Sequence, residues 1–203
     1  MIIEIDPERP RPRDINRVVS AIKAGELVVY PTDTCYGIGG DIFNKNTISR
    51  IYQIKRVPKN TPFSFVCHDL SDISVYARVS DFAYRILKRY LPGPYTFVLK
   101  GSKHVPKMML TKRKTAGIRI PDHNVCLEIT EALGRPVISA SASIDDEIVE
   151  DPRDMASLVG KNGVIVDCGV IPPLPSSVIS LVDDMPEVLR EGRGDVSFFR
   201  EMA

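Results

Sequence analysis

Hydroxyl groups, one carboxylate and two glycines are concentrated in the segment Tyr30–Gly39, which reads Tyr-Pro-Thr-Asp-Thr-Cys-Tyr-Gly-Ile-Gly. Hydroxyl oxygens can accept from an ammonium group or donate to a carboxylate, and glycines let a ligand approach the backbone. One interpretation of the segment is therefore a cup for an amino acid. The other is a tight hairpin in which Asp33 forms a side-chain turn with the backbone. Composition alone does not separate the two.

Basic side chains follow a predicted helix, at Lys55, Arg56 and Lys59, where Pro58 and Pro62 interrupt the chain. Cations suit the C-terminal end of a helix, so these residues could form an ordinary solvated helix end. They could instead hold the phosphates of a nucleotide. Both interpretations remain open at this point.

A second basic region runs from Lys100 to Arg119 and contains no acidic residue. Charged stretches usually lie on a solvated surface, but seven cations without partners repel one another and favour a polyanion nearby. Nucleotides and RNA both qualify. Conversely, the stretch 145–154 is acidic, so the net charge of +1 conceals one basic and one acidic region of the chain. The seven cations are Lys100, Lys103, Lys107, Lys112, Arg113, Lys114 and Arg119.

Serine alternates with alanine from Ser139 to Ser143. In an extended strand this spacing puts the hydroxyls of Ser139, Ser141 and Ser143 on one face and both alanines on the other. A polar face of this kind favours contact with a ligand or with water.

Familiar catalytic motifs are absent from the sequence, which has no nucleotide-binding P-loop, no nucleophile elbow and no dinucleotide fingerprint. The three histidines are isolated, and we assign them no role. The four cysteines form no C-x-x-C pair, so no metal site is predicted and the thiols are expected to be reduced core residues.

Helices and strands are expected to alternate in an α/β sheet with helices on its faces. Helices are expected near 15–22, 48–54, 82–90, where Asp81 can cap the helix, and 126–133. Strands are expected near 27–30, 63–67, 95–99, 118–120, 136–141, 164–167, 178–181 and 188–190. At 203 residues the chain is predicted to form a single domain, 1–203. No apolar run is long enough to span a membrane and no basic leader is present, which predicts a cytoplasmic protein with no membrane partner.

Six segments, in this order, resemble the YrdC family of threonylcarbamoyl-AMP synthases over nearly the whole chain. They are Tyr30–Thr34 with Tyr36-Gly37, Lys55 before the proline break, Leu91–Pro94 followed by Thr96–Leu99, Arg119–Pro121, the serine strand, and Leu189–Gly192. The resemblance implies a YrdC-like α/β fold, with a large twisted mixed sheet flanked by helices and an open, concave, basic face.

Within the family, the chain looks most similar to the YciO branch, because of Lys112-Arg113-Lys114-Thr115 and the segment Arg190–Val196. Two departures from the synthase pattern accompany this likeness. Val57 stands where the family has arginine, with Arg56 as a neighbouring substitute, and Ser143 stands where it has asparagine. Each change removes directional hydrogen bonds from the predicted site.

The implied reaction joins L-threonine, bicarbonate and ATP into threonylcarbamoyl-AMP and pyrophosphate, for the t6A modification of tRNA. ATP is then a substrate accompanied by Mg²⁺, and no tightly bound cofactor is expected. By matched position, the implied catalytic residues are Lys55, Arg56 and Arg119. Threonine and its carbamate would contact Thr32, Thr34, Tyr36 and Ser141, and the nucleotide would contact Lys55, Thr115, Ser139, Ser143 and Arg190.

Two other hypotheses stay open. The chain could be a double-stranded RNA- or tRNA-binding protein that uses Lys112, Arg113 and Lys114 without efficient catalysis. It could also act on another nucleotide or acid, with Val57 and Ser143 resetting its specificity.

Overall fold

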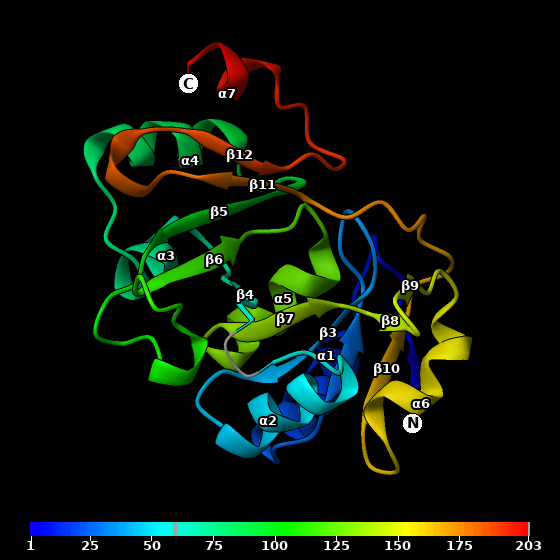
Figure 1. Ribbon diagram of the computed structural model, residues 1–203. Helices are drawn as coiled ribbons and strands as arrows, with labels where there is room; N and C mark the ends of the chain where they lie inside the picture. The colour runs from blue at the N-terminus through cyan, green and yellow to red at the C-terminus, as the bar shows by residue number, and fades with distance from the viewer. Residues whose placement is uncertain (59–60, 203) are drawn as a thin grey trace.

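A ten-stranded mixed sheet forms the centre of the protein (Figure 1), whose computed structural model describes residues 1–58 and 61–202. The strand order is β1-β10-β2-β3-β7-β4-β6-β5-β11-β12, with both parallel and antiparallel neighbours. The strands are β1 Ile2–Glu4, β2 Val28–Tyr30, β3 Gly37–Asp41, β4 Ser64–Val66, β5 Tyr95–Lys100, β6 Thr115–Arg119, β7 Val137–Ser141, β10 Val164–Asp167, β11 Ser177–Ser180 and β12 Glu187–Arg190. A separate two-stranded sheet pairs β8 Ser143–Ile144 with β9 Glu147–Ile148. The expected α/β fold with a large mixed sheet is confirmed.

Helices cover the two faces of the sheet unequally. They are α1 Pro12–Lys23, α2 Lys45–Ile54, α3 Leu70–Tyr76, α4 Asp81–Tyr90, α5 Asn124–Leu133, α6 Ala156–Val159 and α7 Ser197–Glu201, with short 3₁₀ turns at Lys107–Met109, Pro152–Met155 and Val182–Asp184. The larger core contains residues of α2, α3, α4, α6 and α7, and the smaller one contains residues of α1 and α5. Within β4, Phe65 joins the larger core and its neighbour Val66 the smaller, as alternation along a strand requires.

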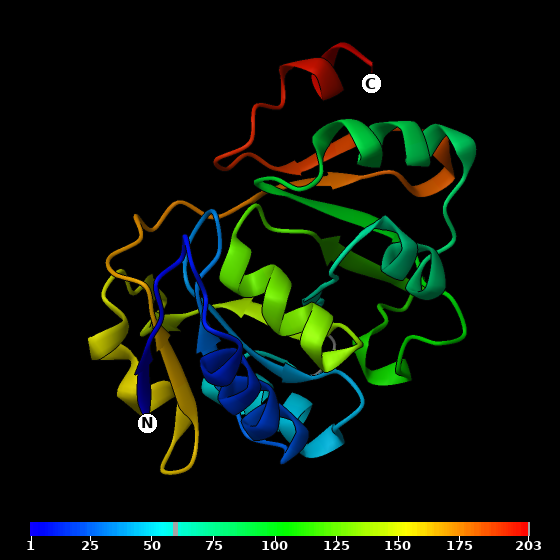
Figure 2. The same ribbon diagram turned by 180° about the vertical axis from the view of Figure 1, so that it is seen from behind.

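The sheet is strongly twisted, as the right-handed twist of strands predicts. In Figure 1, α2 lies in front of the lower strands, whereas α3 and α4 lie behind the upper ones, although all three belong to the same core. Figure 2 shows α1, α5, α3 and α4 together from behind. No described residue of β5, β6, β11 or β12 joins the smaller core, so one face of these strands is left uncovered by helices. That face is turned toward the viewer in Figure 1.

The expected helices have the apolar stripes that their spacing predicted. In α1 the buried residues are Ile15, Val18, Val19 and Ile22, and Gly134 ends α5 in the left-handed conformation. The cap of α4 differs from the expectation. Ser80, not Asp81, is the capping residue, because its hydroxyl accepts from the backbone N–H of Ala83, and Asp81 occupies the first turn.

The segment after Pro31 is a loop followed by a strand, which the sequence did not indicate. β3 contains three glycines in five residues and pairs with both β2 and β7. Glycine is needed at 39, because a Cβ there would lie 2.0 Å from the Ile138 carbonyl oxygen and 2.9 Å from the Tyr30 ring. The segment therefore does form a hairpin, in which β2 and β3 pair antiparallel with Tyr30 opposite Gly37, but residues 31–36 make its loop longer than a tight turn.

Among the described residues, no helix is long and apolar enough to cross a membrane.

Candidate active site

A cleft with a volume of about 460 Å³ opens on the face of the sheet that the helices leave uncovered. Its lining comes from the turn between β2 and β3, from Lys55 at the end of α2, from the segment 62–64, and from strands β5, β6, β7, β11 and β12. Three cationic residues line the cleft: Lys55, Arg119 and Arg190. None of the described lining residues is an aspartate or a glutamate. The cleft is therefore suited to an anion.

The strand registers build the floor of this cleft. Ser139 lies opposite Ser64, Ser64 opposite Gly117, and Gly117 opposite Val98. Residues directly opposite one another on neighbouring strands share a face of the sheet, so these side chains form one row across four strands. The side chains of this row are small, which leaves space above it.

The inner end of the cleft is built around a buried ion pair. One terminal nitrogen of Arg119 (Nη2) donates to Asp33 Oδ1 at 2.6 Å and to Thr34 Oγ1 at 2.9 Å. The side chains of Arg119 and Asp33 are only 7% and 11% exposed. Thr32 Oγ1 accepts from the backbone N–H groups of Thr34 and Cys35. The loop is therefore closed by a threonine hydroxyl, and Asp33 binds arginine in place of the side-chain turn that was the alternative interpretation.

Two atoms of this ion pair have no hydrogen-bond partner among the described residues. They are Asp33 Oδ2, an acceptor, and Arg119 Nε, a donor, and both are buried. Buried polar atoms without partners are uncommon and costly. Of the two residues only Arg119 lines the cleft, so the arginine is the member of the pair that can meet a ligand there.

Lys55 is the second cation of the cleft. It is the C-terminal capping residue of α2, and its ammonium donates to the Ser141 carbonyl oxygen at 3.1 Å and to the Ser143 hydroxyl. Partial burial lowers the pKa of Lys55, and nearby Asp146 opposes this shift. Lys55 therefore supplies a poorly hydrated cation at the cleft.

Arg190 is the third cation and is held by the strand beside it. Its Nε and Nη2 atoms donate to the Ser176 carbonyl oxygen at 3.1 and 2.8 Å. Ser176 is fixed in turn by a 2.8 Å hydrogen bond with Thr96. Burial lowers the pKa of Arg190, and the charge of Arg119 lowers it further. Both arginines line the cleft, so an anion bound there would be attracted by both positive charges.

Several predicted residues are brought to the cleft together. Its lining includes Thr32, Tyr36, Lys55, Thr115, Arg119, Ser139, Ser141 and Arg190. The Tyr36 hydroxyl is already engaged, since it donates to the Gly169 carbonyl oxygen at 2.8 Å and accepts from the Cys168 N–H. Tyr36 can therefore offer a ligand its ring, but its hydroxyl is committed to the loop at 168–169.

Other predicted residues lie outside the lining. Thr34 is buried and bonds to Arg119, so it positions the arginine. The Arg56 side chain is 81% exposed and pairs with Asp145 at 3.2 Å, away from the cleft. Ser143 belongs to β8, so the serine strand ends at Ser141 and the expected single face of three hydroxyls is wrong for the third. Lys59 lies outside the described residues.

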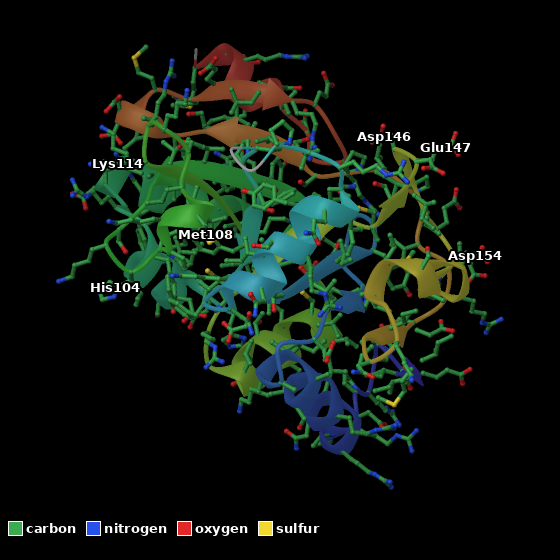
Figure 3. The ribbon with its side chains drawn as sticks, turned by 60° about the horizontal axis from the view of Figure 1, so that its bottom comes forward. His104, Met108, Lys114, Asp146, Glu147 and Asp154 are labelled. Atoms are coloured by element: carbon green, nitrogen blue, oxygen red, sulfur yellow. The ribbon has the colours of Figure 1, made fainter. Side chains whose placement is uncertain are left out.

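The basic region forms the loop between β5 and β6, at the rim of the cleft. The expectation of seven cations without partners is wrong for two of them, because Lys100 pairs with Asp183 and Arg119 with Asp33. The other five are exposed and form no ion pair with described residues: Lys103, Lys107, Lys112, Arg113 and Lys114. Figure 3 shows Lys114 and His104 on the opposite side of the molecule from Asp146, Glu147 and Asp154.

Some residues of the cleft were not anticipated from the sequence. Ser64, Thr96, Thr111 and Ser176 line it, and Cys35 lies in its wall. The sequence could have indicated Thr96, because side chains alternate between the two faces of a strand. Tyr95 and Phe97 on either side of it point into the core, so Thr96 points to the other face. For Ser176 there was no such signal, since its role depends on pairing with distant Thr96 and Arg190.

A protein-held Mg²⁺ does not fit these residues. No group of three metal-binding side chains occurs among the described residues, and the cleft lining has no carboxylate. Mg²⁺ commonly binds through substrate phosphates, so the cation would have to enter with a nucleotide.

These features define a class of α/β protein with an open sheet face, on which a cleft has three cations and no carboxylate among its described lining residues. The chain belongs to the Sua5/YciO/YrdC family, whose model, described as "telomere recombination", matches residues 20–192.

Two relatives show how this likeness extends. The chain is 41% identical over 199 residues to YciO of Escherichia coli (strain K12), with 96% of the chain and 97% of that protein aligned. It is 31% identical over 181 residues to a threonylcarbamoyl-AMP synthase of Pyrococcus abyssi, covering 84% of the chain and 52% of the relative.

Solved structures agree with both likenesses. The crystal structure of Escherichia coli YciO matches with a TM-score of 0.92 and 39% identity, over 98% of each chain. Pyrococcus abyssi Sua5 complexed with L-threonine matches with a TM-score of 0.90 and 28% identity, over all of this chain and 60% of that one.

Proposed function

We propose that the protein is a nucleotidyltransferase of the threonylcarbamoyl-AMP synthase type, which converts L-threonine, bicarbonate and ATP into threonylcarbamoyl-AMP and pyrophosphate. The observation that carries this proposal is the convergence of Lys55, Arg119 and Arg190 on one cleft without carboxylates. Relatives at 31% and 28% identity named as this synthase support it. The product would serve the t6A modification of tRNA in the cytoplasm.

The reaction requires aligned reactants and positive charge near the phosphoryl oxygens more than it requires a strong base. The threonine amine captures bicarbonate as a carbamate with loss of water. A carbamate oxygen then attacks the α-phosphorus of ATP, and pyrophosphate leaves. Because the carbamate is already an anion, its attack needs no further proton removal. Fixed cations that neutralise the phosphoryl oxygens, together with the Mg²⁺ that arrives with ATP, supply the stabilisation.

Each half of the cleft fits one reactant. In this proposal threonine occupies the inner end, where the guanidinium of Arg119, which lines the cleft, binds its carboxylate. Thr32 and Ser141 flank this end. Lys55 and Arg190 bind the phosphates. The carbamate then forms between the two halves, within reach of the α-phosphorus.

Calorimetry with ATP and with L-threonine, followed by pyrophosphate release in the presence of bicarbonate, tests the proposal. We expect each reactant to bind, and pyrophosphate release to require all three together. Binding of neither reactant would overturn the assignment of the cleft. Binding without turnover would support the hypothesis that the chain acts on another nucleotide or acid. Calorimetry with other amino acids then tests that hypothesis.

The five exposed cations of the loop 101–114 favour a second candidate function, binding of double-stranded RNA or tRNA. Phosphate contacts release counterions, so the logarithm of the affinity is expected to fall steeply with the logarithm of salt concentration, by about 0.9 for each phosphate contacted in duplex DNA. Replacing Lys112 or Lys114 with alanine should reduce that slope by about one unit each.

A gel-shift or anisotropy titration of duplex RNA over a range of salt concentrations measures this slope. Lys23→Ala is the matched control, because Lys23 is exposed at the end of α1, a helix that packs in the smaller core and not beside the loop. A flat salt response, or equal slopes for the loop variants and the wild type, would exclude this function.

A further inference from the structure

Four buried side-chain atoms have no hydrogen-bond partner among the described residues. Besides Asp33 Oδ2 and Arg119 Nε, they are the hydroxyl of Tyr30 and Nδ1 of His123. Tyr30 and Asp33 belong to the end of β2 and the loop after it, whereas Arg119 and His123 belong to the end of β6 and the start of α5. The Arg119–Asp33 ion pair joins these two segments. The unpartnered atoms therefore come from the two segments that build the inner end of the cleft.

The backbone of His123 is fixed where the chain enters α5. Its N–H donates to the Pro121 carbonyl oxygen at 3.0 Å, and its carbonyl oxygen accepts from the Leu127 N–H at 3.1 Å. His123 is the N-terminal capping residue of this helix, but its side chain makes no capping hydrogen bond. The imidazole is therefore held in place and is available to another residue.

Asp33 is the residue that needs such a partner. Its Oδ1 accepts from Arg119 at 2.6 Å, and its buried Oδ2 accepts from no described residue. Asp33 is not among the residues that line the cleft, so a ligand there does not reach this oxygen. The missing donor must come from inside the protein, because a buried carboxylate oxygen without a partner is costly. A neutral imidazole with its proton on Nδ1 is such a donor.

The charges around His123 favour this form of the imidazole. Burial lowers the pKa of His123, and the carboxylate of Asp33 is the largest of the charges that oppose this shift. The carboxylates of Asp122 and Glu8 oppose it more weakly. The partial positive charge at the start of a helix also disfavours an imidazolium there. Asp33 in turn favours the tautomer that carries its proton on Nδ1, because that proton faces an acceptor.

We propose that His123 is a positioning residue for the amino-acid carboxylate: it holds Asp33 Oδ2, and Asp33 thereby holds Arg119 in the orientation that binds the ligand. Since the two atoms make no direct hydrogen bond, the link runs through one ordered water, the usual occupant of a buried polar site. A carboxylate bonded at both oxygens keeps the guanidinium oriented before the amino acid enters. This inference rests on the proposed function, since it presumes that the cleft binds an amino acid.

Calorimetry that compares L-threonine with L-threoninamide, which lacks the carboxylate, tests this role. We expect His123→Leu to lower the affinity for threonine about tenfold and to leave the affinities for threoninamide and ATP unchanged. His123→Asn should restore most of the loss, because its amide can occupy the place of Nδ1. His68→Leu is the matched control, since it removes an imidazole whose Nδ1 contacts the Leu127 carbonyl oxygen instead.

Nitrogen NMR of the imidazole tests the link to Asp33 without any ligand. We expect neutral His123 to carry its proton on Nδ1. Asp33→Asn should lower the pKa of His123, because it removes the carboxylate that opposes the effect of burial. Thermal unfolding checks that each variant is folded.

The outcomes separate this inference from the proposed function. A pKa and tautomer of His123 that do not respond to Asp33→Asn would overturn the inference and leave the proposed function in place. Wild-type threonine affinity in His123→Leu would do the same. An equal loss for threonine and threoninamide would also overturn it, since the substitution would then disturb more than the carboxylate contact. A wild type that binds no threonine would overturn both.

Discussion

Replacing Lys55 with alanine is expected to lower the affinity for ATP by about 10- to 100-fold, because hydrogen bonds between charged groups contribute about 1.5–3 kcal/mol each. Pyrophosphate release should fall below detection. Lys55 is held at the edge of the cleft by the Ser141 carbonyl oxygen and the Ser143 hydroxyl, so its ammonium is already oriented before a ligand enters. Calorimetry and a pyrophosphate assay measure the two effects.

The control for this prediction is Lys45→Ala, which removes the same charge from the other end of the same helix. Its ATP affinity should equal that of the wild type. Thermal unfolding of both variants separates loss of binding from loss of folding. If Lys55→Ala is folded and binds ATP as tightly as the wild type, the phosphates do not lie against Lys55.

The lowered pKa of Lys55 adds a dependence on pH with a definite sign. A lysine binds phosphate through its ammonium form, which is lost as the pH rises through its pKa. Because burial lowers that pKa, the loss begins at a lower pH than for an ordinary lysine of pKa about 10.4. ATP affinity should therefore decline as the pH rises toward 10, and the decline should begin below the pH at which an ordinary lysine loses its charge. Lys55→Arg, which stays charged throughout this range, should bind ATP with a flatter profile.

The regular elements of the protein were predictable because their sequence patterns are local. The stripe of Ile15, Val18, Val19 and Ile22 identifies α1, and the β-branched run before Pro31 identifies β2. By contrast, β3 has three glycines and gives no propensity signal. It is a strand because β2 and β7 flank it on both sides, which is tertiary information.

The sequence indicated individual residues of the candidate site, but it did not indicate which of them contact one another. The sequence indicated Asp33 and Arg119 separately, the first as a turn former and the second as one of seven cations. Only the folded sheet brings them together across 86 residues of sequence. The same holds for Arg56. Its position beside Val57 suggested a substitute cation, but its backbone is in the left-handed region at φ 48°, and its side chain leaves the cleft for Asp145.

The Arg119–Asp33 pair leads to the largest expected effect on stability. Replacing Arg119 with methionine would leave the carboxylate of Asp33 buried without a counter-charge. Breaking a buried ion pair in this way costs about 3–5 kcal/mol. We expect a loss of this size in the free energy of unfolding measured by denaturant titration, together with loss of threonine binding. The exposed pair Arg56–Asp145 is the control, since removing one partner of such a pair changes stability by about 0–1 kcal/mol.

A double variant shows whether the pair exists for stability or for binding. Adding Asp33→Leu to Arg119→Met removes both charges, so no buried group is left unpaired, and apolar replacement of a buried ion pair is often neutral. The double variant should therefore recover much of the lost stability and still fail to bind threonine. If the pair is a ligand site, stability and binding separate in this way. If the two substitutions instead destabilise additively, the two side chains do not form the pair on which the inner end of the cleft is built. If threonine binding returns with stability, the ion pair supports the fold alone, and Arg119 is not a contact for an amino acid.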